Sequence, residues 1–124
     1  MNQEVTLDLI RKEKPDSVIV ASGSRTLILP IEGIDNPAII HGSDLLDGKR
    51  AAGKKVLVVG GGMVGCETAA FLGEQNHDVT VIEFRDTVGA DVIHEHRVYL
   101  MKDFEDYKIK EITGAKVCKF YEDA

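Results

Sequence analysis

The chain has 124 residues, of which 44% are hydrophobic, a content ordinary for one modest globular domain that makes disorder unlikely. Its formal net charge is -6 and its lysines and arginines form no cluster, which argues against a nucleic-acid partner, because neutralising phosphates needs concentrated positive charge. The acid surplus indicates solubility and nothing more specific.

The lack of targeting signals and the positions of the cysteines and histidines argue against a membrane protein, a secreted protein and a metal or dithiol site. No apolar stretch is long enough to span a membrane, and residues 1–16 lack the features of a signal peptide, so a cytoplasmic protein without a membrane partner is expected. Cys66 and Cys118 are too far apart in sequence for a redox or metal spacing, and no CxxC occurs. His94 and His96 would diverge on a helix, so no metal site is expected.

The first fifty residues carry short apolar runs separated by turns. Residues 4–14 favour a short amphipathic helix, and residues 18–21 form an apolar run typical of a buried strand. Small residues follow at 22–24, where they would permit the close approach of a ligand. Ser43 is a candidate N-cap for a short helix, and the polar, glycine-bearing stretch 47–55 is the best candidate for a domain junction.

Residues 56–84 have the pattern of a dinucleotide-binding βαβ unit. Residues 56–59 are apolar without alternation, which is typical of a parallel strand buried on both faces. Gly60, Gly62 and Gly65 then follow in G-x-G-x-x-G spacing. The first glycine allows the turn, the second lets a pyrophosphate approach the backbone, and the third lets the next helix lie close to the strand.

A helix is predicted over residues 63–75, with its N-terminus pointing at the phosphates of the nucleotide. Its apolar stripe, which should pack on the sheet, consists of Val64, Thr68, Phe71 and Leu72. Asn76 breaks the helical pattern, and asparagine tolerates the left-handed conformation that a helix end requires.

A second strand over residues 79–82 ends at Glu83, about 20 residues past the glycines, where a carboxylate can bind the adenosine ribose hydroxyls. This favours NAD over NADP, because a 2′-phosphate would meet a negative charge. Arg85 is near enough to leave the opposite preference open. The alternative to nucleotide binding is a glycine-rich turn that binds nothing.

The remaining forty residues continue the α/β pattern. Asp91 is a candidate cap for a helix that runs through Phe104, and residues 107–113 and 115–121 are predicted strands. An open sheet of this kind normally needs at least one more central strand to cover its edge. The predicted fold is therefore a truncated α/β unit with a parallel sheet and flanking helices.

Several stretches resemble the C-terminal part of flavoenzymes of the 2-enoate reductase and 2,4-dienoyl-CoA reductase group, which are NADH:flavin oxidoreductases. These stretches are KPDSVIVASGS at 14–24, LPIEGID at 29–35 and GKKVLVVGGGMVGCETAAFL at 53–72, followed by VTVIE. The resemblance covers nearly the whole chain. It implies a Rossmann-like FAD/NAD(P)-binding fold, with a partial FAD-binding segment at 1–50 and an NAD(P)-binding βαβ domain, incomplete at its C-terminus, at 51–124.

The resemblance also implies a mechanism. NADH passes hydride to FAD, and electrons then pass through a 4Fe-4S cluster to FMN, which reduces the activated double bond of an enoate or dienoyl-CoA. This chain contains neither the barrel domain nor the cluster cysteines, so its partners would be the dinucleotide and the rest of its own polypeptide. Alone it should not complete the reaction, and no catalytic residue is assigned.

By the same resemblance, Ser22 and Gly23 lie near the flavin, with Ser22 where threonine is usual, and Met63 and Glu67 face the nicotinamide pocket. A glutamate in the first turn of a helix is equally explained by its favourable interaction with the helix dipole. The complete set of candidate cofactor-binding residues is Gly60, Gly61, Gly62, Met63, Val64, Gly65, Glu67, Glu83, Phe84, Arg85, Ser22 and Gly23.

Three further alternatives stay open. A helix N-terminus can lower the pKa of a thiol such as Cys66, although a small buried packing residue is the commoner case. The chain could be a nucleotide-binding or redox-sensing module without chemistry of its own. It could also be part of a pyridine-nucleotide disulfide reductase, against which the missing CxxC counts.

Overall fold

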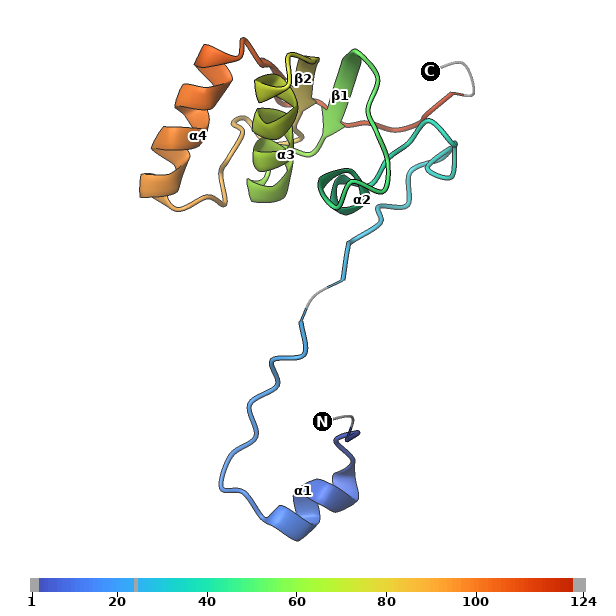
Figure 1. Ribbon diagram of the computed structural model, residues 1–124, viewed down its shortest axis with the longest axis vertical. Helices are drawn as coiled ribbons and strands as arrows, with labels where there is room; N and C mark the ends of the chain where they lie inside the picture. Colours follow the sequence, from blue (N-terminus) through green and yellow to red (C-terminus); the bar gives the residue numbers. More distant parts are fainter. Residues whose placement is uncertain (1–2, 24, 122–124) are drawn as a thin grey trace.

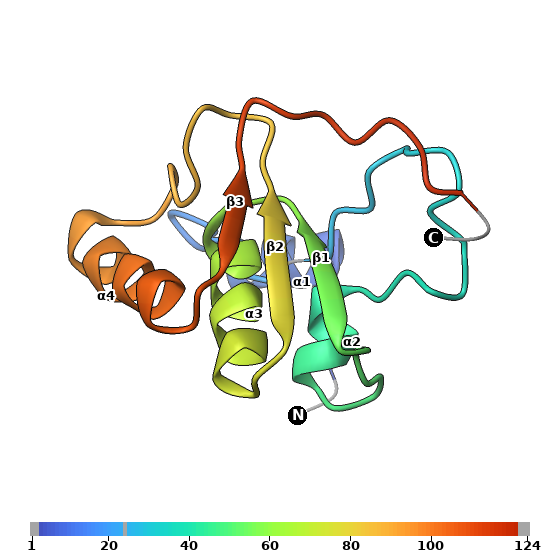
Figure 2. The ribbon, with the colours of Figure 1, turned by 90° about the horizontal axis from the view of Figure 1, so that it is seen from above.

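The computed structural model describes residues 3–23 and 25–121. Four helices and three strands occur in these ranges: α1 (Leu7–Glu13), α2 (Gly42–Leu46), β1 (Lys55–Val59), α3 (Met63–Glu74), β2 (Asp78–Ile82), α4 (His94–Asp106) and β3 (Lys110–Ile112). The strands form a parallel sheet in the order β1-β2-β3, in which Lys55 pairs with Asp78 and Thr80 with Lys110 (Figure 2). None of the described helices is long and apolar enough to cross a bilayer.

The helices α3 and α4, which connect successive strands, lie on the same face of the sheet (Figure 2). Val79 and Val81 of β2 point to this face and are buried, while Leu57 and Val59 of β1 alternate to the other face and are 52% and 38% exposed. The expectation that residues 56–59 are buried on both faces is therefore wrong for the described residues. The parallel sheet with flanking helices confirms the expected Rossmann-like α/β fold.

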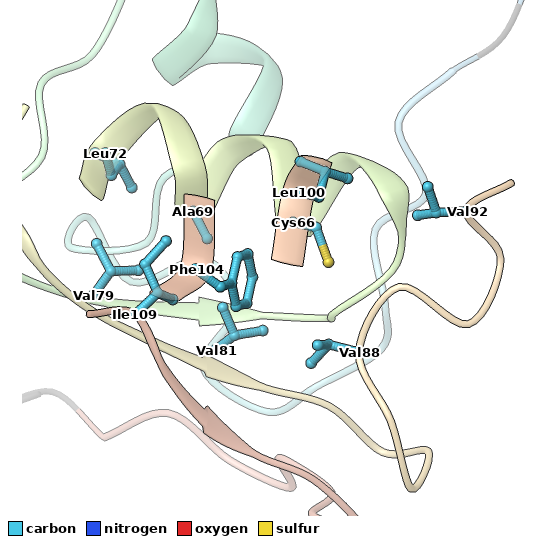
Figure 3. Packing of buried hydrophobic residues seen from close by; sticks show 10 residues of the cluster. All are labelled: Cys66, Ala69, Leu72, Val79, Val81, Val88, Val92, Leu100, Phe104 and Ile109. Atoms are coloured by element: carbon cyan, nitrogen blue, oxygen red, sulfur yellow. The ribbon is translucent and has the colours of Figure 1, made fainter. Parts of the chain in front are cut away.

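The core lies between α3, α4 and the sheet (Figure 3). Its α3 members, Cys66, Ala69 and Leu72, are at most 1% exposed. They pack against β2 and against Leu100 and Phe104 of α4. Because α3 contacts both the sheet and α4, its buried stripe is centred on these three positions.

The predicted α3 stripe is correct in part. Thr68 and Leu72 are 5% and 1% exposed, but Val64 and Phe71 are 59% and 37% exposed, so packing of those two on the sheet is wrong. Thr68 is accommodated because its hydroxyl donates a hydrogen bond of 2.7 Å to the carbonyl oxygen of Val64. Asn76 follows the helix with φ 64, as its sequence position predicts.

Both predicted side-chain caps are wrong. Helix α2 begins at Gly42 after the N-cap His41, so Ser43 lies within the helix. Helix α4 begins at His94, and Asp91 lies three residues before it. Asp91 instead accepts a hydrogen bond from the backbone N–H of Met63, at the start of a different helix.

Two predicted strands are absent. Ile19 and Val20 are 90% and 83% exposed in an extended segment that leads from α1 towards the α/β unit (Figure 1), and residues 115–121 form only one bridge, from Lys119 to Glu32. A strand needs a neighbour to receive its backbone hydrogen bonds, and local sequence does not supply one.

The contact between α3 and the glycine turn gives a direct test of this fold. A Cβ at Gly65 would lie 1.8 Å from the carbonyl oxygen of Gly60, a backbone atom. We expect Gly65→Ala to lower the free energy of unfolding by about 3 kcal/mol or more, although alanine normally favours helices over glycine. Urea denaturation measures this change.

Gly53→Ala is the matched control, because its Cβ would meet no atom within 4 Å. It should change the free energy of unfolding by less than about 0.5 kcal/mol. Equal effects of the two substitutions would contradict the close packing of α3 against the turn.

Candidate functional site

The candidate site is built on the turn between β1 and α3. Gly60 has φ 102, a conformation that favours glycine, and its N–H donates a 2.8 Å hydrogen bond to the carbonyl oxygen of Ile82 at the end of β2. The close approach of Gly65 to Gly60 then directs the first turn of α3 towards the carboxyl end of the sheet. The structural roles expected for the first and third glycines of the motif are therefore present.

The carboxylate of Glu83 lies beside this turn, directly after β2. Its Oε2 accepts a 2.6 Å hydrogen bond from the N–H of Gly61, and its Oε1 accepts a 2.8 Å hydrogen bond from the N–H of Arg85. The first of these bonds is partly buried. Each oxygen retains a further lone pair, so the group is held in place and can still accept hydrogen bonds from a ligand.

The N-terminus of α3 points into the same region. Its N-cap is Gly62, so no capping side chain from that residue satisfies the backbone N–H groups of the first turn. The N–H of Met63 lies 3.1 Å from Oδ1 of Asp91. A helix N-terminus carries partial positive charge, which suits either a carboxylate or a phosphate.

The loop between β2 and α4 packs over the glycine turn. The N–H of Gly89 donates a 2.6 Å hydrogen bond to the carbonyl oxygen of Gly61, and a Cβ on Gly61 would lie 2.8 Å from the Val88 side chain. Arg97 of α4 holds this loop, because its Nη2 lies 3.1 Å from both the carbonyl oxygen of Val88 and Oγ1 of Thr87. Val88 itself belongs to the core (Figure 3).

The other candidate residues near the turn lie around its rim. Met63 and Val64 are exposed in the first turn of α3, and Phe84 is 70% exposed after Glu83. Glu67 is half-buried, with its Oε1 3.8 Å from Nε2 of His96 on α4. Met63 and Val64 thus directly follow the glycines of the turn, and Phe84 and the exposed Arg85 directly follow Glu83.

Ser22 and Gly23 are not part of this group. They lie between α1 and α2 in the chain, outside the described helices and strands, and a Cβ at Gly23 would meet nothing within 4 Å. Sequence reasoning also missed Val88, Arg97 and the position of Asp91, because all three depend on how a loop folds back. The glycine at 89, with φ 65, is the only local signal of that tight turn.

Cys66 is a packing residue. It is fully buried, its thiol donates a 3.3 Å hydrogen bond to the carbonyl oxygen of Gly61, and burial raises the pKa of the thiol from 9.0 to about 11. The helix N-terminus does not offset this burial. Within residues 3–23 and 25–121, no group of three histidine, cysteine, aspartate or glutamate residues could hold a metal ion.

The raised pKa of Cys66 predicts a difference in reactivity between the two thiols. At pH 8 only about 0.1% of Cys66 should be thiolate, and the side chain is enclosed, whereas Cys118 is exposed. Labelling with a chromogenic disulfide reagent should modify one thiol quickly and the second only in denaturant. Fast labelling of folded Cys118→Ser protein would contradict the buried position of Cys66.

Comparison with known proteins gives consistent matches. Residues 2–124 match the pyridine nucleotide-disulphide oxidoreductase family. The chain is 36% identical over 110 residues to bilirubin reductase of Mediterraneibacter gnavus, covering 89% of this chain and 17% of that protein. It is 34% identical over 122 residues to cinnamate reductase of Clostridium sporogenes, covering 96% and 18%.

The structure superposes on 2-naphthoyl-CoA reductase, in its complex with 2-naphthoyl-CoA, with a TM-score of 0.79 and 31% identity, covering 100% of this chain and 19% of that one. The chain therefore spans less than a fifth of these three relatives. The family match over residues 2–124, together with the fold and the glycine turn, shows that this chain belongs to the pyridine nucleotide-disulphide oxidoreductase family of flavin-linked, pyridine nucleotide-dependent oxidoreductases.

Proposed function

We propose that this chain is the NADH-binding part of a larger flavin oxidoreductase that passes hydride from NADH to FAD and reduces an activated carbon–carbon double bond. The observation that carries the proposal is the Glu83 carboxylate, held by the Gly61 and Arg85 N–H groups at the carboxyl end of β2. A carboxylate at this place in a βαβ unit suits the two ribose hydroxyls of NADH.

The glycine turn fits the pyrophosphate. Gly60 and Gly62 present backbone without side chains, and the N-terminus of α3 supplies N–H donors and partial positive charge. Met63 lies in the first turn of α3 and Glu67 at the start of the second, which supports their assignment to the nicotinamide half. NADPH is the less favoured ligand, because its 2′-phosphate would meet the Glu83 carboxylate. The exposed Arg85 is the one residue beside Glu83 that favours the opposite preference, because it could pair with that phosphate.

The flavins and the iron-sulfur cluster belong to the proposed whole protein. FAD, when bound, would accept the hydride, and Ser22 and Gly23 are the described residues assigned to its neighbourhood. FMN and a 4Fe-4S cluster would be held elsewhere in the polypeptide, since a cluster of this kind takes four cysteines and this chain has two, one of them buried.

The contacts support insertion of the nucleotide unit into another domain. The N–H of Phe120 donates a 2.8 Å hydrogen bond to the carbonyl oxygen of Glu32, and the amide of Asn36 donates one of 3.0 Å to that of Tyr121. The chain thus enters and leaves the unit at one place. Helix α2 packs on α3 and so belongs to the nucleotide unit, although it lies within the flavin-domain segment expected at 1–50. We therefore propose that the junction between the two domains lies near residue 31, earlier than expected.

The names of the relatives favour the substrate class. Cinnamate is an α,β-unsaturated carboxylate and 2-naphthoyl-CoA is an aromatic acyl thioester, so both carry unsaturation conjugated to a carbonyl group. This supports reduction of an enoate or enoyl-CoA type of double bond. A disulfide reductase is the second candidate, which the family description favours, but a CxxC is missing from the sequence. A non-catalytic nucleotide-binding module is the third.

Calorimetric titration with NADH and with NADPH tests the role of Glu83. Native protein should prefer NADH, and Glu83→Ala should weaken NADH binding about 10-fold or more, because charge-assisted hydrogen bonds to the ribose are lost. The preference for NADH over NADPH should fall at the same time. If the substitution only distorted the turn, it would instead weaken the binding of NADH and of NADPH equally.

Glu74→Ala, at the opposite end of α3, is the matched control and should leave both affinities unchanged. Thermal unfolding of Glu83→Ala protein shows whether the turn survives the loss of the two backbone hydrogen bonds. Absence of nucleotide binding by folded native protein would refute the proposed site, and an unchanged nucleotide preference would refute the role of Glu83.

A further inference from the structure

We propose that Asp91 is a positioning residue whose carboxylate occupies the place of a nucleotide phosphate at the N-terminus of α3 and competes with it. This inference rests on the proposed function. Oδ1 of Asp91 lies 3.1 Å from the N–H of Met63, and a Cβ on Gly62 would lie 3.0 Å from Oδ2. The carboxylate therefore faces the backbone of the second motif glycine, where the pyrophosphate is expected.

The position of Asp91 is set by its loop. The hydrogen bond between Gly89 and Gly61 and the burial of Val88 and Val92 fix the backbone on both sides of Ala90 and Asp91. Asp91 itself is exposed, so its side chain can swing away without unpacking the core. The loop thus presents a movable carboxylate to a fixed helix end.

Two carboxylates at one turn have opposite consequences for a dinucleotide. Glu83 can accept hydrogen bonds from ribose hydroxyls, so its charge helps binding. Asp91 lies against the helix end that would hold the phosphates, so its negative charge opposes binding until the side chain moves. Asp91 would thereby hold the turn in shape when no nucleotide is bound and lower the affinity for NADH.

Calorimetric titration of NADH into Asp91→Asn and Asp91→Ala protein tests this competition. Asparagine can keep the hydrogen bond to Met63 without the charge, whereas alanine removes both. Both variants should bind NADH about 3- to 10-fold more tightly than native protein. Without nucleotide, Asp91→Ala should lower the unfolding temperature by about 4 °C, while Asp91→Asn should change it little.

Asp86→Asn is the matched control, because it removes the same charge from an exposed position in the same loop, and it should alter NADH affinity less than 2-fold. Native binding with unchanged or weaker binding by both Asp91 variants would overturn the competition and leave the proposed function standing. Failure of native and variant proteins alike to bind NADH would overturn the proposed function, and this inference with it.

Discussion

The close approach of Gly65 to Gly60 is the contact on which the rest of the structure depends. It lets α3 begin directly above the end of β1, so that Cys66, Ala69 and Leu72 reach β2 and α4. The same contact directs the backbone N–H groups at the start of α3 towards the carboxyl end of the sheet. Packing of the core and presentation of an anion-binding helix end therefore have one cause, and a single methyl group at position 65 would disturb both.

The electrostatics of the turn follow from the lack of side chains in it. Because Gly61 and Gly62 have no side chains, neighbouring segments approach the backbone of the turn closely. Two of them supply carboxylates, Glu83 from the end of β2 and Asp91 from the loop before α4. The first lies where a ribose would be recognised and the second where a phosphate would bind. The proposed nucleotide affinity is thus a balance between two acidic residues that lie eight positions apart in sequence.

The parts of the fold that sequence predicted are those fixed by local chemistry. The positive φ of Gly60, the helix that follows it and the left-handed Asn76 each depend on neighbouring residues only. The wrong predictions concern residues whose structure depends on contacts with segments distant in the sequence. Residues 18–21 have a strand-like composition but no strand beside them among the described residues. Val64 is exposed because α4 and the sheet cover the side of α3 that carries Cys66, and Val64 lies outside it.

The candidate site divides in the same way. The glycines and Glu83 could be found from spacing, because the length of one βαβ unit sets the distance between them. The sequence predicts a capping role for Asp91 but at the wrong helix, because the tight turn at Gly89 brings Asp91 back to α3. The support that Arg97 gives to this loop has no sequence signal, because it depends on the packing of α4.

The most direct test of the nucleotide site is amide chemical-shift mapping of the whole chain during addition of NADH. We expect saturable shifts concentrated at Gly60 to Gly65 and at Glu83 to Arg85, with further shifts at Asp91 and little change in α1. Saturable shifts that are centred elsewhere, or no shifts in folded protein, would contradict it.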